Sequence, residues 1–343
     1  MQAATRNEKT NIQSAPGWPE YRTLTIALDR YDRHIPFFLD DLRISDGIRL
    51  KALEVGMLPP RRDGVDRHKR MLVDREFDVS EVSLASYIIA KHRGAPFTAV
   101  PVFPRRLFSQ NHIFVNVDAK VHKPADLIGK RVGIWAFQVT MSVLAKGDLK
   151  SDYGVPWERI RWVTQHPEEI AWKGDGLPIE RAPAGKDLAE MLVSGELDAL
   201  IHPHPPAIIE ERTDRVRRLF PNPIDECVRY HRRHGYFPIM HLLALKAELA
   251  EAIPGLPRKL IDVWDEAKRQ ARDFYRDPGY ALMAFARNEY ERQIETLGDD
   301  PWLSGLAANR ANLNRFMEYM VDQKLIPEPL PVEALFHPTV LDS

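Results

Sequence analysis

The sequence feature that most constrains the fold is a pattern that occurs twice. DREFDVSEVSLASYI (residues 74–88) and SGELDALIHPHPPAI (194–208) each run from a helix end through Glu–apolar–Asp into an apolar strand. Each then passes polar residues or prolines and resumes as a helix. Further strand-like segments, among them 23–28, 97–103 and 131–135, alternate with helical ones. This alternation is typical of α/β proteins with a parallel sheet covered by helices, and its repetition predicts two α/β lobes.

The two repeated units also predict where a ligand would bind. Ligands of open α/β sheets bind beyond the carboxyl ends of strands, so two facing lobes would bring both strand ends into one cleft. Glu81 stands at the end of the first of these strands, just before a helix expected over 84–92. Burying a carboxylate without partners is costly, so we expect Glu81 to line this polar cleft. The alternative is a surface carboxylate that the dipole of the following helix stabilises.

Composition excludes several classes of function. The chain has 343 residues with 44% hydrophobic residues and a formal net charge of -1, which gives no general attraction to nucleic acid or anionic membranes. Its single cysteine, Cys227, excludes an internal disulfide and a CxxC metal site. No apolar run approaches the roughly 18 residues of a membrane helix. Residues 1–20 are polar, so we expect a flexible tail without an export signal and a cytoplasmic protein.

Nucleotide binding and serine nucleophile chemistry have no sequence support. The chain contains neither GxGxxG nor GxxxxGK[ST], and it has no GxSxG elbow.

A set of motifs in a fixed order resembles one family. FDVSEVSLASY, PVFPRRLF…IFVN, DLIGKRVGI…T…KG…YGV, GELDALI and YFPIMH together resemble the 4,5-dihydroxyphthalate decarboxylases over roughly residues 22–340. The resemblance implies an α/β, two-lobed type II periplasmic-binding-protein-like fold with a central cleft. The chain would cross between the lobes twice, with residues 21–105 plus 246–343 in lobe 1 and 106–245 in lobe 2. It also implies decarboxylation of an aromatic acid without an organic cofactor.

The chain departs from that family's pattern at three places. Ser109–Gln110 stands where the family carries Arg–His, Ala136–Phe137 where it carries Glu–Tyr, and His204 where it carries Arg. All three fall in segments expected at the cleft, so the resemblance leaves the exact aromatic acid open.

Loss of CO2 from an aromatic ring needs a proton donor, cations for carboxylates and groups that polarise ring hydroxyls. Arg105 and Arg106 follow the strand at 97–103, and a guanidinium binds carboxylate with two hydrogen bonds. The family position best matches Arg106; a solvated basic turn is the alternative for both. Thr140 is expected near a helix start, where free N–H groups attract anions, and Gln138 would add a side-chain contact. The alternative is a plain helix cap.

Three histidines are candidate proton-transfer groups. His202 and His204 lie in HPHPP and share one side of an extended segment, and His241 lies in the strand expected over 238–246. Histidine exchanges protons near neutral pH. We expect catalytic roles for Glu81 and these histidines with no cofactor. A divalent metal held by His202, His204 and His241 stays open, as do a proline-fixed turn for the first two and a core or hinge role for His241.

The remaining candidates are polar residues at the ends of early strands. Asp29 and Tyr31 follow the first strand, and one of them would orient ring hydroxyls or a histidine, unless they only form its turn. Ser83 would donate to a carboxylate, unless it only caps the next helix. The basic run RHKR (67–70) is expected on a solvated helix face.

Three functions remain in competition. The first is a carboxy-lyase that acts on a hydroxylated, phthalate-type acid, such as 4,5-dihydroxyphthalate to protocatechuate, by protonation of the ring. The second is a non-catalytic solute-binding protein for a small aromatic acid, because one fold serves many functions. The third is another enzyme on this scaffold, such as a metal-assisted hydrolase or a precursor-synthesis enzyme. The expected partner is a small aromatic carboxylate, and the helical C-terminal part offers surface for a homo-oligomer.

Overall fold

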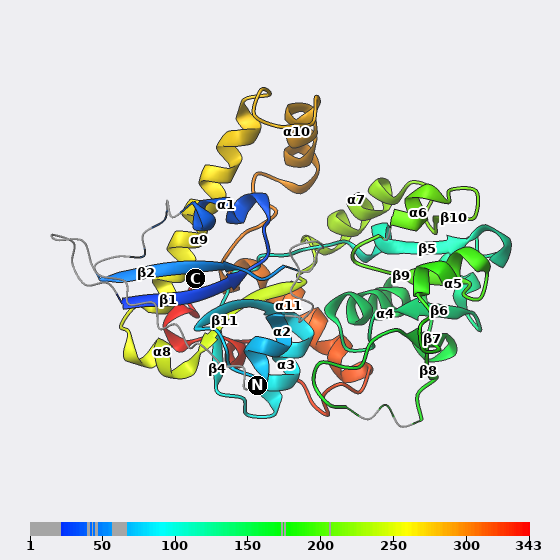
Figure 1. Ribbon diagram of the computed structural model, residues 1–343, viewed down its shortest axis with the longest axis horizontal. Coiled ribbons are helices and arrows are strands. Elements are labelled where there is room, and N and C mark those ends of the chain that lie inside the picture. The colour runs from blue at the N-terminus through cyan, green and yellow to red at the C-terminus, as the bar shows by residue number, and fades with distance from the viewer. Residues whose placement is uncertain are drawn as a thin grey trace, which may run out of the picture.

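A computed structural model describes residues 22–39, 42, 44, 47–56, 67–172, 174, 176–205 and 207–343 of the chain. The described part contains two β-sheets, each with its own helices, and they lie on opposite sides of the molecule (Figure 1). The predicted two-lobed α/β fold is therefore confirmed. The tail expected over 1–20 falls outside the described residues.

The sheet of the first lobe has the strand order β2-β1-β3-β11-β4. Its strands are β1 Arg22–Leu28, β2 Ile48–Glu54, β3 Val79–Ser83, β4 Phe97–Val100 and β11 His241–Lys246. Its helices are α1 Ile35–Phe38, α2 Arg67–Leu72, α3 Leu84–His92, α8 Ala247–Ala252, α9 Leu256–Arg276, α10 Ala286–Leu297 and α11 Leu306–Asp322.

This first sheet is mixed, whereas the alternating sequence pattern suggested a parallel one. β1 runs parallel to β2 and β3, but β11 runs antiparallel to both β3 and β4. The reason is the route of the chain, because β11 comes directly from the second lobe. It enters the sheet at the end where β3 leaves, with His241 opposite Ser83.

The second lobe has a six-stranded sheet with the order β10-β5-β9-β6-β7-β8. β5 runs antiparallel to β9 and β10, while the β9-β6-β7-β8 part is parallel. Its strands are β5 Ile113–Asn116, β6 Arg131–Ile134, β7 Arg161–Thr164, β8 Ile179–Arg181, β9 Ala199–Ile201 and β10 Val216–Arg218. Its helices are α4 Thr140–Tyr153, α5 Leu188–Ser194, α6 Ala207–Glu211 and α7 Pro223–His234.

The chain passes between the lobes twice, from β4 to β5 and from α7 to β11. The two connections lie side by side: Arg106 and Ile239 form an isolated antiparallel bridge, and the N–H of Leu107 donates to the carbonyl of Pro238 at 3.1 Å. The division expected from sequence placed residues up to 245 in the second lobe. The pairing of β11 with β3 and β4 places the strand that begins at His241 in the first lobe.

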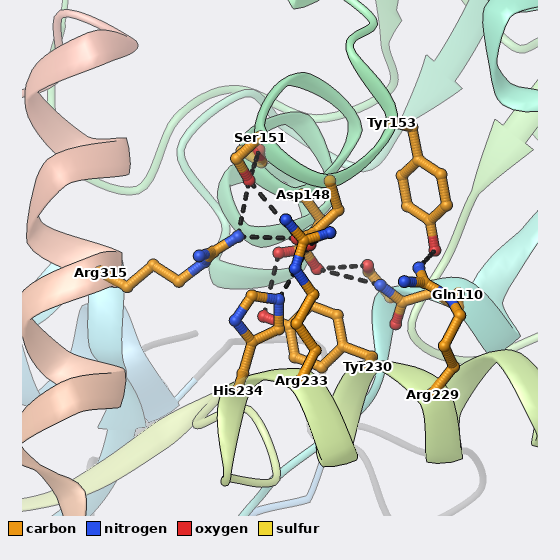
Figure 2. Close-up of polar contacts among 12 residues, drawn as sticks. Gln110, Asp148, Ser151, Tyr153, Arg229, Tyr230, Arg233, His234 and Arg315 are labelled. Atoms are coloured by element: carbon orange, nitrogen blue, oxygen red, sulfur yellow. Dashed lines mark hydrogen bonds and ion pairs between the residues drawn. The ribbon is translucent and has the colours of Figure 1, made fainter.

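Side chains of α11 and α4 also connect the lobes. Figure 2 shows Arg315 of α11 reaching toward Ser151 and Asp148 of α4. The guanidinium donates to the Ser151 hydroxyl at 2.8 Å, and the Tyr319 hydroxyl donates to Asp148 at 3.1 Å. A Cβ atom at Gly147 would lie only 2.2 Å from the ring of Tyr319, so this close approach requires glycine. The apolar core also continues through both lobes.

No helix in the described part of the chain has both the length and the apolar character that a membrane span needs.

Candidate active site between the lobes

A cavity of about 500 Å³ lies between the lobes, where the ends of β3 and β9 meet. The structure thus brings together the two strand ends that the repeated sequence pattern pointed to. Six residues predicted for the site line this cavity: Ser83, Arg105, Thr140, His202, His204 and His241. Five other predicted residues are outside its lining: Asp29, Tyr31, Glu81, Arg106 and Gln138.

Glu81 lies in the wall behind the cavity rather than on its surface, which corrects the expectation that it lines the cleft. Its side chain is fully buried. Arg67 pairs with it at 3.0 Å, and Nδ1 of His241 donates to it at 2.5 Å. Burial favours the neutral acid, but Arg67 and the bond from His241 outweigh burial and hold the pKa of Glu81 well below its usual range. Glu81 is therefore a buried anion in contact with a histidine of the cavity.

The remaining contacts of Glu81 explain two further predicted residues. The Tyr31 hydroxyl donates to Glu81 at 3.1 Å, and burial followed by the charge of Glu81 raises the pKa of Tyr31, so it stays a donor. The backbone N–H of Asp29 donates to Glu81 at 3.3 Å, while the Asp29 carboxylate lies 3.6 Å from Arg67. Both residues hold the buried ion pair in place and do not reach the cavity.

The protonation of His241 follows from its bond to Glu81. Burial lowers the pKa of His241 to about 3, although Glu81 acts in the opposite direction, so the ring is neutral at neutral pH. A neutral imidazole has one donor and one acceptor nitrogen. Because Nδ1 carries the hydrogen that binds Glu81, Nε2 is the acceptor. His241 thus gives the cavity a base with a carboxylate behind it.

Arg105 and Arg106 have separate environments. Arg105 lines the cavity and donates from Nη1 to Nε2 of His204 at 3.0 Å. Arg106 instead donates to the carbonyls of Phe237 and Leu303 and to Asn309, at 2.7, 3.1 and 2.5 Å. Burial lowers the pKa of Arg106 to about 9. The cavity guanidinium is therefore Arg105, and the expectation that favoured Arg106 is wrong, since Arg106 holds the two crossing segments and α11 together.

His202 and His204 are linked to each other and to Arg105. The backbone N–H of His204 donates to Nδ1 of His202 at 3.0 Å. Burial lowers the pKa of His202 to about 4, and burial together with Arg105 lowers that of His204 to about 2. Both rings are neutral at neutral pH, so they serve as hydrogen-bonding groups of the wall rather than as stored protons.

The N-terminus of α4 forms another part of the wall. Val139, Thr140 and Met141 line the cavity, and the N–H groups of a first helical turn have no acceptor within the helix. This end of the helix suits an anion. Gln138 is directed elsewhere, because its side chain donates to the carbonyl of Ile170 at 3.0 Å.

Comparison with curated proteins decides the family. Over 330 residues the chain is 32% identical to the 4,5-dihydroxyphthalate decarboxylase of Comamonas testosteroni, a match that covers 93% of this chain and 98% of that protein. This chain belongs to the 4,5-dihydroxyphthalate decarboxylase family. The protein of the same name from Pseudomonas putida is 32% identical over 224 residues, which cover 62% of this chain and 83% of its own. No family model matches the chain.

Solved structures place this decarboxylase-family chain among proteins of one fold. The periplasmic sulfonate-binding protein SsuA from Methylobacillus flagellatus KT aligns with a TM-score of 0.59 at 11% identity, over 94% of this chain and 93% of that one. The alkanesulfonate-binding SsuA from Xanthomonas axonopodis pv. citri, bound to MOPS, aligns at 0.55 and 14% identity, over 92% and 99%. At such identities the likeness shows the fold, which is periplasmic-binding-protein-like.

Sequence reasoning missed several residues in and behind the cavity wall, of which Arg67 and His68 lie closest to the Glu81–His241 pair. Arg67 is fully buried against Glu81 and Asp29, and His68 lines the cavity, although the run RHKR was expected on a solvated face. The presence of Glu81 in an apolar strand could have been used to predict Arg67. An ion at the end of an apolar strand needs a buried cation, and RHKR is the nearest basic run before it.

The metal set left open by the sequence does not assemble among the described residues. His202 and His204 have ring centroids 6.4 Å apart, and within the described ranges no group of three His, Cys, Asp or Glu side chains is arranged to hold a metal ion.

Proposed function

We propose that this chain is a carboxy-lyase that removes CO2 from a hydroxylated aromatic acid, with 4,5-dihydroxyphthalate to protocatechuate as the first candidate reaction. Family membership supports the reaction class. One observation carries the assignment to this cavity. It is the His241–Glu81 pair, which offers a base to the same space that Arg105 lines.

In this proposal, the carboxylate that leaves is held by charge and by N–H groups. Arg105 is the cation of the described lining, and its planar guanidinium suits a carboxylate. The start of α4 around Thr140 supplies N–H donors to the same anion or to a second carboxylate of the ring. His204 accepts a hydrogen bond from Arg105, and His202 holds His204 in place by accepting its backbone N–H.

The ring hydroxyl is held at His241. Nε2 of His241 accepts the hydroxyl proton, and Glu81 stabilises the imidazolium that forms. The oxygen then pushes electron density to the ring carbon that bears the carboxylate. That carbon takes up a proton, the bond to the carboxylate breaks with release of CO2, and its electron pair restores the aromatic ring. His241 finally returns its proton to the oxygen, so each turnover consumes one proton.

The proton that joins the ring carbon comes from water in this scheme. With pKa values of about 4 and about 2, His202 and His204 hold no proton to give at neutral pH. A hydroxyl conjugated with the reacting carbon supplies the electron density that an organic cofactor would otherwise provide. We therefore propose that no organic cofactor takes part.

The test is CO2 release from a panel of hydroxyphthalates and hydroxybenzoates by the purified protein. We expect release from at least one acid with a hydroxyl conjugated to the carboxylate-bearing carbon, and a loss of at least about 100-fold in the His241→Asn variant. No release from the whole panel would refute the proposal.

The second candidate is a solute-binding protein for an aromatic acid. The likeness to two sulfonate-binding proteins favours it. Thermal stabilisation by an acid that is recovered chemically unchanged after prolonged incubation would support binding without turnover.

A further inference from the structure

His202 follows directly after β9 and brings a buried ring to the cavity wall of the second lobe. The residue is 9% exposed and lines the cavity. The mechanism proposed above uses one nitrogen of this ring, Nδ1, which accepts the backbone N–H of His204. The other ring nitrogen, Nε2, has no role in it.

The hydrogen bonds of His202 decide which nitrogen carries the ring hydrogen. A backbone N–H can only donate, so Nδ1 of His202, at 3.0 Å from the backbone nitrogen of His204, is an acceptor. The hydrogen of the ring is therefore on Nε2. Burial, which lowers the pKa of His202 to about 4, agrees with this neutral form. The carbonyl of His202 accepts from His112, and no hydrogen bond joins Nε2 to a described residue.

Asp187 is the carboxylate of the cavity wall that could compete for this donor, but it is engaged at the start of α5. One oxygen of Asp187 accepts the backbone N–H groups of Ala189 and Glu190 at 2.8 and 3.2 Å. The other accepts from the side chain of Gln165 at 3.2 Å. Buried polar groups are normally hydrogen-bonded, so the donor of His202 points to an acceptor inside the cavity.

Arg105 indicates which acceptor this is. Its guanidinium donates to Nε2 of His204 at 3.0 Å and to the carbonyl of Pro203 at 3.4 Å, so it lies against the segment that directly follows His202. After burial, the charge of Arg105 is one of the causes that lower the pKa of His202. A guanidinium has five N–H donors, and a carboxylate bound by those that are left has a second oxygen to offer to His202.

We propose that His202 binds the carboxylate of the aromatic ligand through its Nε2–H, as the neutral partner of Arg105. This inference rests on the proposed function, because it takes the ligand to be an aromatic acid. Arg105 supplies the charge from the segment between the lobes, and His202 adds a directed hydrogen bond from the second lobe. Two donors on one carboxylate fix the orientation of that group and favour an acid over a neutral ring of the same size.

Two substitutions separate this role from a purely structural one. Asparagine places its amide oxygen where Nδ1 of histidine lies, so His202→Asn keeps the acceptor for His204 and loses the donor at Nε2. Glutamine places its amide nitrogen near the position of Nε2, so His202→Gln keeps the donor and loses the bond to His204. A ligand-binding role predicts the larger loss of acid binding for asparagine, and a structural role predicts it for glutamine.

The experiment is titration calorimetry with 3-hydroxybenzoate and 3-hydroxybenzyl alcohol. They differ in the carboxylate, and a hydroxyl at position 3 is not conjugated with the carbon that bears it, so no turnover is expected. His202→Asn should bind the acid at least about tenfold more weakly than the wild-type protein, as the loss of a hydrogen bond to a charged group implies. Its affinity for the alcohol should change by less than about threefold, because a neutral oxygen makes a weaker bond.

The matched control is His112→Gln. His112 holds the carbonyl of His202 from behind at 3.2 Å and is outside the described cavity lining, so this variant disturbs the same segment without removing the donor. His112→Gln and His202→Gln should both keep the affinity for the acid within about threefold of the wild-type value, as expected when the charged hydrogen bond stays. Melting temperatures of all variants report any loss of fold.

Three results would overturn the inference: unchanged acid binding in His202→Asn, equal weakening of the acid and the alcohol, or the same selective loss in His112→Gln. A wild-type protein that does not bind the acid would overturn it as well. The proposed function fails separately. If the selective loss follows His202 as expected but the wild-type protein releases no CO2 from hydroxylated acids, the carboxylate site stands and the lyase assignment falls.

Discussion

Ser83 and Thr140 join the two lobes directly above the cavity, with their hydroxyl oxygens 2.9 Å apart. Ser83 ends β3 in the first lobe, and Thr140 begins α4 in the second. The Thr140 hydroxyl also accepts the backbone N–H of Ala85 at 3.1 Å. The starts of α3 and α4 therefore meet at the site, and the same two side chains that line the cavity also hold it closed.

This contact leads to a first prediction, for Thr140→Val. Valine keeps the size of threonine but removes both bonds to the first lobe, so closure over a ligand becomes less favourable. We expect aromatic acids to bind about five- to tenfold more weakly, as the loss of about 1 kcal/mol implies. Titration calorimetry checks this, with Thr164→Val as the matched control, since Thr164 bonds to Glu180 within the second lobe. Equal losses in both variants would contradict a specific role for Thr140.

The neighbouring arginines give a second prediction. Arg105→Met removes the guanidinium of the cavity and should lower kcat/KM by about 10- to 100-fold, in line with a charged hydrogen bond of about 1.5–3 kcal/mol. Arg106→Met removes three hydrogen bonds, to the carbonyls of Phe237 and Leu303 and to the side-chain oxygen of Asn309, so it should lower the free energy of unfolding by about 2–4 kcal/mol. Steady-state kinetics and urea unfolding of both variants test the pair. If Arg106→Met instead lowered kcat/KM and Arg105→Met lowered the free energy of unfolding, Arg106 would be the residue that binds the substrate.

A third prediction concerns the buried ion pair. Glu81→Gln deprives His241 of its carboxylate and leaves the buried charge of Arg67 with the longer, 3.6 Å contact to Asp29. We expect turnover to fall by at least about 100-fold and unfolding free energy to fall by about 3–5 kcal/mol. The double variant Arg67→Met/Glu81→Gln should recover much of the stability without recovering turnover. If turnover returned with stability, Glu81 would act only by holding the fold.

A fourth prediction follows from Asp148, which is buried in α4 at the connection to α11. Its carboxylate accepts hydrogen bonds from Ser109 at 2.6 Å and from Tyr230 and Tyr319 at 3.1 Å each. Burial, with a further contribution from Asp152, raises the pKa of Asp148 from 3.8 to about 7. The folded protein therefore keeps a proton that the unfolded chain releases between these pH values.

The contribution of Asp148 to stability is thus complete below about pH 4 and is lost as the pH rises through 7. The interval between the two pKa values corresponds to a change in the free energy of unfolding of at most about 4 kcal/mol. We expect Asp148→Asn to remove this pH dependence, so that the variant gains stability relative to the wild-type protein from pH 5 to pH 8. Urea unfolding at several pH values measures it. Parallel stability curves for the two proteins would show that Asp148 does not titrate in this range.

The sequence could predict those residues of the site that lie at the ends of strands. The repeated Glu–apolar–Asp pattern located the ends of β3 and β9, because short apolar strands followed by helices have a regular sequence signature. Ser83 and His202 follow directly from that reasoning, and both line the cavity. The direction of β11 could not be read in the same way, since a strand's sequence pattern is identical whichever way it enters the sheet.

Side-chain direction limited the prediction elsewhere. Arg105 and Arg106 are neighbours in an extended segment, where successive side chains point to opposite sides, so only one of them can face the cavity. The register that decides between them comes from the bridge of Arg106 with Ile239, far away in sequence. Arg67 and His68 were missed for a similar reason, because a basic run has the same composition whether it is solvated or paired with a buried carboxylate.

Gly147 has a consequence beyond the packing of α4 against α11. Its missing side chain makes room for the ring of Tyr319, so a larger residue at one position demands a smaller residue at the other. Among relatives that keep this arrangement of helices, the two positions should change together rather than independently. An alignment of such relatives would then reveal the contact between the two helices as covariation of these two positions.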